Sequence, residues 1–264
     1  AQDRLFFQLD EEFEAYRHAK ISATRPGGRA PRERLRVQSP GERERGAHRA
    51  ILAWIDRTLA SEYPSRFPPA RDRPTDIRKC WDAVALDVQE DLVAVQRTPA
   101  GTDAVIAVHV CFPSGWRPET TAGWDFRRIH KPVPQFADHP DTARSLADAM
   151  IERGPYVRFV WTVCADDFLD HHPEEGKRLP WEAARRRGWL RVERQVTVPF
   201  PEHEAALFLI RTYLTPFEAL GPEQQTTLAT AIDCMPRDVL RYKNLDRSAI
   251  RSALDRRGPD IADT

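Results

Sequence analysis

The sequence predicts an α+β fold, in which one antiparallel sheet is flanked by helices and continues into helical segments at both ends of the chain. Three runs in the second half are rich in β-branched and aromatic residues, as strands are: YVRFVWTV, GWLRVERQVTV and AALFLIRTYL. Other runs carry apolar residues at helical spacing, among them HRAILAWIDRTLASEYP and DTARSLADAMIERG. Each kind of element needs a partner layer against which to bury its apolar side, and an α+β arrangement provides one.

Residues 1–80 are expected to form a helical arm and an arginine- and proline-rich connector. Residues 1–24 repeat apolar side chains at a spacing typical of an amphipathic helix or of an arm lying on the body of the protein. Residues 25–46 are rich in proline, glycine and charge, which favours an exposed connector. Its arginines also suit a nucleic-acid-binding arm, but interleaved glutamates and a lack of aromatic residues favour the connector. A helix is expected from His48 to the residues before Pro64.

Residues 81–220 are expected to form the core, and residues 221–264 a C-terminal helical extension. The run from Trp81 to Arg97 predicts two short strands joined at residues 89–91, and a further buried strand ends at Phe112. Helices are expected at residues 141–154, 222–235 and 251–257. The expected sheet has about five antiparallel strands, with a helix-and-loop segment inserted between strands in mid-sheet. A pocket or groove is expected where this insertion crosses the sheet.

Composition argues against several classes of function. The chain has 264 residues and a formal net charge of +0, without the basic surplus typical of nucleic-acid binding. No run approaches the roughly 18 apolar residues of a membrane span, so no membrane association is expected. The four cysteines are far apart and form no CxxC pair, which favours reduced thiols and a cytoplasmic location. The motifs of dinucleotide, P-loop and α/β-hydrolase sites are absent.

Polar side chains alternate along the predicted strand GWLRVERQVTV. Arg191, Glu193, Gln195 and Thr197 share one face of this strand, because successive side chains point to opposite faces. A sheet with one solvated face explains the alternation, and so does a polar ligand held against the sheet. The paired N–H donors of arginine suit carboxylates, so Arg191 and Arg211 are candidate clamps for an acidic group. Glu193 is the matching candidate for an amine.

Two other regions contain candidate metal ligands. His109 and Cys111 share one face of a predicted strand, where a histidine is usually a hydrogen-bonded core residue and nothing beside the cysteine in sequence would activate its thiolate. Residues 164–176, CADDFLDHHPEEG, are dense in potential ligands but lack the spacing of a mononuclear site. An acidic, solvated helix end with Asp166 and Asp170 on one face explains this run better.

The stretch RRIHKPVPQF, residues 127–136, places one histidine beside stiff backbone. Pro132 and Pro134 fix their own φ angles and favour extended geometry in the residues that precede them. Such stiffness would hold the imidazole of His130 in a set orientation, as a ligand requires. A histidine in a simple proline-rich turn is the alternative interpretation.

Six short sequence segments together resemble one protein family. VQEDLVAV, VCFPSGW, IHKPVPQF, WLRVERQVTVPFP, ALFLIRTYLTPFEAL and RYKNL occur in the order found in the haem-dependent oxidative N-demethylase family, across residues 81–245. The resemblance implies a PAS-like fold, a curved antiparallel sheet whose helices enclose a b-type haem (haem b, iron protoporphyrin IX). It also implies oxidative removal of a methyl group from a small amine-bearing substrate, using dioxygen and electrons from an external flavin and iron–sulfur reductase.

The resemblance further implies which residues hold the cofactor. His130 would be the axial ligand of the haem iron, since neutral imidazole is a common ligand in oxygen-binding haem proteins. Arg127, Arg128 and Lys131 would meet the haem propionates. The sheet adds two further cofactor-binding candidates, Arg191 and Arg211.

Catalytic roles are expected for three side chains on the sheet: Glu193, Gln195 and Tyr213. Glu193 is assigned to amine recognition or proton delivery. The buried strand histidine and cysteine named above remain alternatives to His130 as the iron ligand.

Two departures from the family keep other functions open. Where the family has an Arg-x-Asn-Trp phrase, this chain reads RFVWTV, so Val160 replaces the amide, and the arginine-rich connector is not a family feature. A biosynthetic haem enzyme with a different oxidation and a haem-based gas or redox sensor are therefore alternatives, although no sensor output module is recognisable. A haem-free binding domain or hydrolase is a third. The substrate stays open, and a homo-oligomer is compatible with the sequence.

Overall fold

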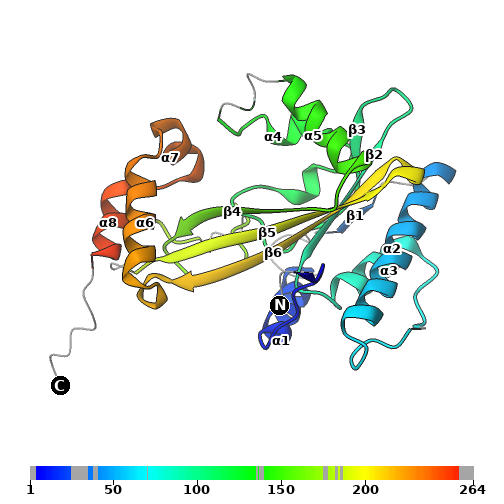
Figure 1. The fold of residues 1–264 in the computed structure, drawn as a ribbon, viewed down its shortest axis with the longest axis horizontal. Helices are drawn as coiled ribbons and strands as arrows, with labels where there is room; N and C mark the ends of the chain where they lie inside the picture. The colour runs from blue at the N-terminus through cyan, green and yellow to red at the C-terminus, as the bar shows by residue number, and fades with distance from the viewer. Residues whose placement is uncertain are drawn as a thin grey trace.

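A central antiparallel sheet confirms the predicted α+β class (Figure 1). The computed structural model describes residues 4–24, 35–37, 41–69, 71–134, 136, 140–174, 178–181, 184 and 187–255. Within these residues the sheet has six strands in the order β1-β3-β2-β6-β5-β4. The strands are β1 (Leu35–Val37), β2 (Asp91–Arg97), β3 (Asp103–His109), β4 (Tyr156–Cys164), β5 (Trp189–Phe200) and β6 (Ala205–Pro216). The three strands predicted in the second half of the chain are confirmed as β4, β5 and β6.

One face of the sheet packs against α2 (Glu42–Glu62) and α3 (Ile77–Ala85). Ile51 and Ile55 of α2 form one apolar cluster with Leu207 of β6, which removes all three side chains from water. An extended N-terminal segment and α1 (Phe13–Thr24) lie along the same part of the molecule (Figure 1). The helix α1 is fixed there by buried Lys20, whose ammonium donates to the carbonyl oxygens of Ala85, Val88 and Glu90.

The opposite face of the sheet is covered by α4 (Phe126–His130) and α5 (Pro140–Glu152). Ile151 of α5 packs with Val95, Val105 and Ala206, which come from three neighbouring strands. This second apolar layer confirms the predicted helix insertion between the strands and fixes α4 above the sheet.

The C-terminal helices are α6 (Pro222–Asp233), α7 (Arg237–Lys243) and α8 (Arg247–Leu254). They gather at the far end of the β5–β6 hairpin (Figure 1), where Ile232 and Ile250 pack with Val163 and Phe217. Short 3₁₀ turns occur at Pro118–Thr120, Pro201–His203 and Phe217–Ala219. No helix in the described part of the chain is both long and apolar enough to cross a membrane.

Three sequence predictions about the fold need correction. Residues 77–85 form the helix α3 and not a strand, because Trp81, Val84 and Ala85 lie on one helical face and the Asp76 side chain accepts a hydrogen bond from the Lys79 N–H at the N-terminus of the helix. The helix α7 was not predicted. The expected connector of residues 25–46 lies mostly outside the described residues, but its described parts are the strand β1 and the first turn of α2. The division at residues 80 and 220 stays a prediction.

Candidate functional site

His130 ends the short helix α4 and is held by its own helix. Its Nδ1 lies 2.8 Å from the carbonyl oxygen of Phe126. A carbonyl oxygen only accepts hydrogen bonds, so Nδ1 carries the proton and Nε2 keeps its lone pair. The ring lies between Phe126, with centroids 3.9 Å apart, and Phe136, with centroids 5.1 Å apart. Within the described residues Nε2 has no hydrogen-bond partner.

The surroundings of His130 keep its ring neutral. Burial lowers the pKa of His130, the hydrogen bond to Phe126 opposes this, and the positive charge of Arg158 lowers it further. Because the resulting pKa lies below 6.5, the neutral ring dominates at pH 7. A neutral imidazole with one N–H given to a backbone carbonyl is the form in which histidine usually binds a metal.

The expected cause of this rigidity was wrong. Lys131, which precedes Pro132, has φ −51° and ψ −36° and is helical, not extended. The N–H of Val133 then donates to the carbonyl oxygen of His130 at 2.9 Å, which closes a turn. The ring is therefore oriented by the carbonyl of Phe126 and by two aromatic neighbours, and the prolines terminate the helix after it.

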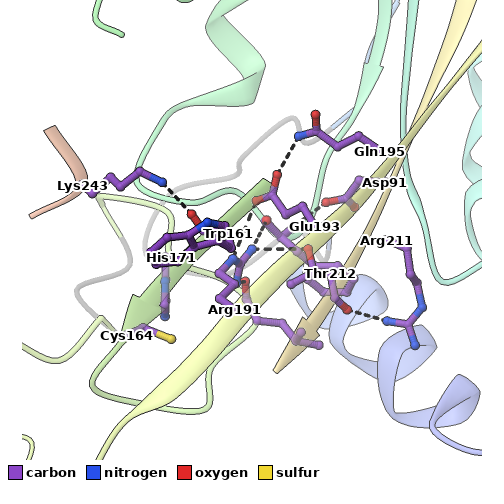
Figure 2. Close-up of polar contacts among 12 residues, drawn as sticks. Asp91, Trp161, Cys164, His171, Arg191, Glu193, Gln195, Arg211, Thr212 and Lys243 are labelled. Atoms are coloured by element: carbon purple, nitrogen blue, oxygen red, sulfur yellow. Dashed lines mark hydrogen bonds and ion pairs between the residues drawn. The ribbon is translucent and has the colours of Figure 1, made fainter. Parts of the chain in front are cut away.

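A row of polar side chains runs along the sheet from Arg158 to Glu193 (Figure 2 shows its β5 members). The Nε–H of Arg158 donates to Oε1 of Gln195 at 2.7 Å, and Nε2 of Gln195 donates to Oε2 of Glu193 at 2.9 Å. Nε of Arg191 lies 3.8 Å from Oε1 of Glu193. Arg158 is the Cα partner of Gln195, and Val160 is that of Glu193, so these side chains project from the same face.

This polar row lies on the α4–α5 face of the sheet. Thr197, two residues from Gln195, is the partner of Phe208, and Phe208 is the partner of Val93. Val93 packs in the apolar layer beneath Ile151 of α5. The row therefore shares its face with His130, which agrees with the effect of the Arg158 charge on the His130 ring.

Two residues of α7 approach Glu193 from the C-terminal helices. Lys243 Nζ donates to the carbonyl oxygen of Trp161 at 2.6 Å (Figure 2). Burial lowers the pKa of Lys243 and the charge of Glu193 opposes this; burial raises the pKa of Tyr242, and Glu193 raises it further. The charge of Glu193 therefore acts on the Lys243 ammonium and the Tyr242 phenol, both in the motif RYKNL.

The other predicted cofactor residues are placed differently. Arg127, Arg128 and Lys131 are exposed around α4, and the guanidinium of Arg128 lies 4.0 Å from the centroid of the Trp124 ring. Arg191 is buried and donates to the carbonyl oxygens of Leu169 at 2.9 Å and of Phe112 at 2.7 Å, so most of its donors are used by the protein.

Arg211 and Tyr213 do not join the polar row. They alternate with Thr212, which faces the row, so they project from the opposite face of β6. Arg211 donates to the carbonyl oxygen of Gln8 at 3.3 Å and to the carboxylate of Asp10 at 2.8 Å. Figure 2 shows Arg211 pointing toward α1, away from Glu193. Its guanidinium also lies 4.5 Å from the centroid of the Tyr213 ring.

The remaining candidate ligands satisfy one another. Nε2 of buried His109 lies 3.4 Å from Asp82 of α3, and its Nδ1 lies 3.8 Å from Sγ of Cys111. The helix expected at residues 164–176 is wrong, because the described residues after Cys164 form an irregular loop. Asp167 and Glu174 of this loop are exposed, whereas Asp166 and His171 are buried, with His171 Nε2 2.7 Å from Asp166. No group of three or more potential metal ligands occurs among the described residues.

The residues missed from the sequence are those whose position depends on register. Arg158 stood at the start of the phrase RFVWTV, but only the β4–β5 pairing brings it beside Gln195. Phe126 and Phe136 were visible on both sides of His130 without any signal that they stack on its ring. Lys243 and Tyr242 belong to a helix that was not predicted.

One face of the sheet thus carries a neutral imidazole nitrogen and a row of polar side chains. These are features of a protein that binds a cofactor or another small molecule. The family model described as haem-dependent oxidative N-demethylase, alpha subunit-like, matches residues 2–251. This match covers nearly the whole chain, so the protein belongs to the haem-dependent oxidative N-demethylase alpha subunit-like family.

Proposed function

We propose that this chain is a haem-dependent oxygenase that oxidatively removes a methyl group from a small amine-bearing substrate, with dioxygen as oxidant and electrons from an external flavin and iron–sulfur reductase. Family membership supports haem dependence and oxidative demethylation. The proposal includes a PAS-like sheet and haem b. It also includes a cytoplasmic location, for which the four free cysteines are the support.

The observation that carries this proposal is the state of His130. Its Nδ1 proton is donated to Phe126, its Nε2 has no partner in the described chain, and two phenylalanine rings restrict its rotation. This donor chemistry fits an axial imidazole ligand of haem iron. Val160, which is 38% exposed on the same face, offers apolar surface to a porphyrin.

Cations near His130 would meet the two haem carboxylates. Arg158 uses only its Nε–H on Gln195, which leaves its terminal N–H groups for such a carboxylate. Arg127, Arg128 and Lys131 are exposed on and after α4 and are further candidates. Bound haem would supply the activation of dioxygen, and the protein would supply the ligand, the charges and the substrate site.

Glu193 is the proposed amine-recognition residue. Gln195 holds Oε2 by a hydrogen bond, so the carboxylate is oriented and Oε1 is the oxygen toward which a substrate N–H would point. The same oxygen can accept a proton and return it during turnover. Gln195 is a positioning residue in this scheme, and no role is assigned to Tyr213, which projects from the other face.

Absorption spectroscopy tests the haem ligand. Protein reconstituted with haem should show a Soret band that shifts with carbon monoxide, and His130→Ala should abolish or strongly alter it because the axial nitrogen is removed. His18→Ala, at an exposed histidine of α1, is the matched control and should leave the spectrum unchanged. An unaltered spectrum in His130→Ala would reassign the ligand.

Formaldehyde release tests the reaction and Glu193. The haem-loaded protein, given reductant, dioxygen and a panel of methylated amines, should release formaldehyde. Glu193→Gln should lower kcat/KM by about 100-fold or more while the Soret band is retained. Glu202→Gln, at an exposed turn, is the matched control and should leave kcat/KM unchanged. Full turnover by Glu193→Gln would remove Glu193 from the mechanism, and haem binding without any turnover would favour a sensor.

A further inference from the structure

The carboxylate of Glu193 is reached from the β4 side of the sheet. Its Cα partners are Val160 on β4 and Thr212 on β6. Thr212 is buried, and so is Arg191, which lies two residues before Glu193 on the same face. In contrast, Val160 is 38% exposed, and the Glu193 side chain itself is 19% exposed. A ligand that approaches Oε1 of Glu193 therefore passes over β4 and contacts the side chain of Val160.

Val160 is an apolar residue between two polar ones on this face of β4. Arg158 and Thr162, two residues to either side, project from the same face. Opposite charges stabilise each other across a strand pair, but the position directly opposite Glu193 holds a valine instead of a cation. Val160 belongs to none of the apolar clusters in the described part of the chain. Its methyl groups are therefore available to a ligand beside the carboxylate.

The helix α7 bounds the same position at the next residue of β4. Nζ of Lys243 donates to the carbonyl oxygen of Trp161 at 2.6 Å, which fixes α7 against the strand one residue beyond Val160 (Figure 2). Tyr242, the preceding residue of α7, is 48% exposed, and the charge of Glu193 acts on its phenol. A ligand bound to Glu193 therefore has the Val160 methyl groups on one side and α7 on another.

We propose that Val160 determines substrate specificity, and that the amine bound by Glu193 carries an apolar alkyl substituent longer than methyl. This inference rests on the proposed function, since it takes Glu193 as the residue that binds the amine. An ammonium that pairs with the carboxylate leaves its carbon substituents to contact the neighbouring surface. An alkyl chain gains free energy against the valine methyl groups, because its methylenes leave water. A chain that ends in a hydroxyl loses hydrogen bonds to water at the same surface.

Two amines of equal length test this preference: N-methylbutylamine, and N-methylpropanolamine, in which a hydroxyl replaces the terminal methyl group. For the haem-loaded protein, kcat/KM for formaldehyde release should be about tenfold higher with the alkylamine. Val160→Thr replaces one methyl group by a hydroxyl of similar size and should lower this ratio about threefold or more. Val157→Thr, at a 49% exposed valine on the opposite face, is the matched control and should leave the ratio unchanged. Both amines are measured in one preparation, so partial unfolding of a variant does not alter the ratio.

Equilibrium binding separates this inference from the proposed reaction. Calorimetry of the haem-loaded protein without reductant should give a lower Kd for N-methylbutylamine, and Val160→Thr should reduce the difference between the two amines. A difference in Kd that depends on Val160, without formaldehyde from either amine, would support the alkyl site and overturn the proposed reaction. Equal values for the two amines in the wild type, or an unchanged ratio in Val160→Thr, would overturn the inference. An altered Soret band in Val160→Thr with an unchanged ratio would assign Val160 to the porphyrin alone.

Discussion

Arginines occur on both faces of the sheet, and Arg158 differs from the others in how its donors are used. On the α2–α3 face, Arg211 donates to Gln8, Thr212 and Asp10, and Arg194 donates to Leu5 and Phe6. On the α4–α5 face, Arg191 donates to Leu169 and Phe112, whereas the Arg158 side chain bonds to Gln195 through Nε alone.

The difference shows how a structural polar residue is told from a candidate functional one. Both kinds alternate along a strand in the same way. Arg194 and Arg211 attach the N-terminal segment to the sheet by donating to its carbonyl oxygens, at Leu5, Phe6 and Gln8. Arg158 keeps terminal N–H groups that no described residue uses, beside a histidine with a free Nε2. Unused donors, and not alternation, mark the candidate binding residues.

The largest effect is expected from Arg211→Met. This change removes the cation beside Oδ2 of Asp10 and the donors to the carbonyl oxygens of Gln8 and Thr212, so the free energy of unfolding should fall by about 3–5 kcal/mol in urea denaturation. Arg17→Met, at an exposed arginine of α1, should change it by less than about 0.5 kcal/mol. If Arg211→Met cost less than about 1 kcal/mol, the distinction between structural arginines and Arg158 would fail.

A pH-dependent loss of stability is expected from His48, which lies in α2 on the structural face. Burial lowers its pKa from 6.5 to about 4, against the opposing charge of Glu44. Its Nδ1 accepts from Trp81 and its Nε2 has no partner, so the folded protein holds the neutral ring. As the pH falls from 6.5 to about 4, the unfolded chain takes up a proton that the folded chain refuses, which removes up to about 3 kcal/mol of stability.

The measurement is the free energy of unfolding across that pH range for the wild type and for His48→Asn. The Oδ1 of asparagine can replace Nδ1 as acceptor for Trp81 but does not titrate. The variant should therefore show a shallower pH dependence, and an identical slope in both proteins would remove His48 as its source.

The smallest effect on stability is expected from Arg158→Leu, within about 1 kcal/mol, because the side chain is exposed. Its consequence should appear at His130 instead. Removing the cation should raise the pKa of His130. A proton then competes with the haem iron for Nε2 at a higher pH, so the haem spectrum should be lost at a higher pH during acidification. Arg153→Leu, at an exposed arginine just after α5, controls for the loss of an arginine charge. If the pH at which half of the haem spectrum is lost were the same in Arg158→Leu and wild type, Arg158 would not influence the pKa of His130.

Much of the fold followed from local pattern, because β-branched runs and helical apolar spacing are properties of short segments. The strands β4, β5 and β6 and the helices α2, α5 and α6 were predicted in this way. The helix α3 was missed because its apolar residues Trp81, Val84 and Ala85 also fit short strands. The helix is favoured over a strand by the hydrogen bond that the Asp76 side chain accepts at its N-terminus and by packing on α2.

The candidate site was predictable only in part. Alternation correctly grouped Arg191, Glu193 and Gln195 on one face. It could not give the register that adds Arg158, nor the approach of α7 to Glu193, because both depend on contacts between segments far apart in sequence. For His130 the residue was identifiable, but the carbonyl and rings that orient it were not.

The β4 edge of the sheet is closed in part by a side chain from another element. The carbonyl oxygen of Trp161 in β4 accepts a hydrogen bond from Nζ of Lys243 in α7 at 2.6 Å. A lysine ammonium at a sheet edge hinders the addition of a further strand, because it occupies an acceptor that the new strand would need. The C-terminal helices therefore help to protect the sheet from edge-to-edge association.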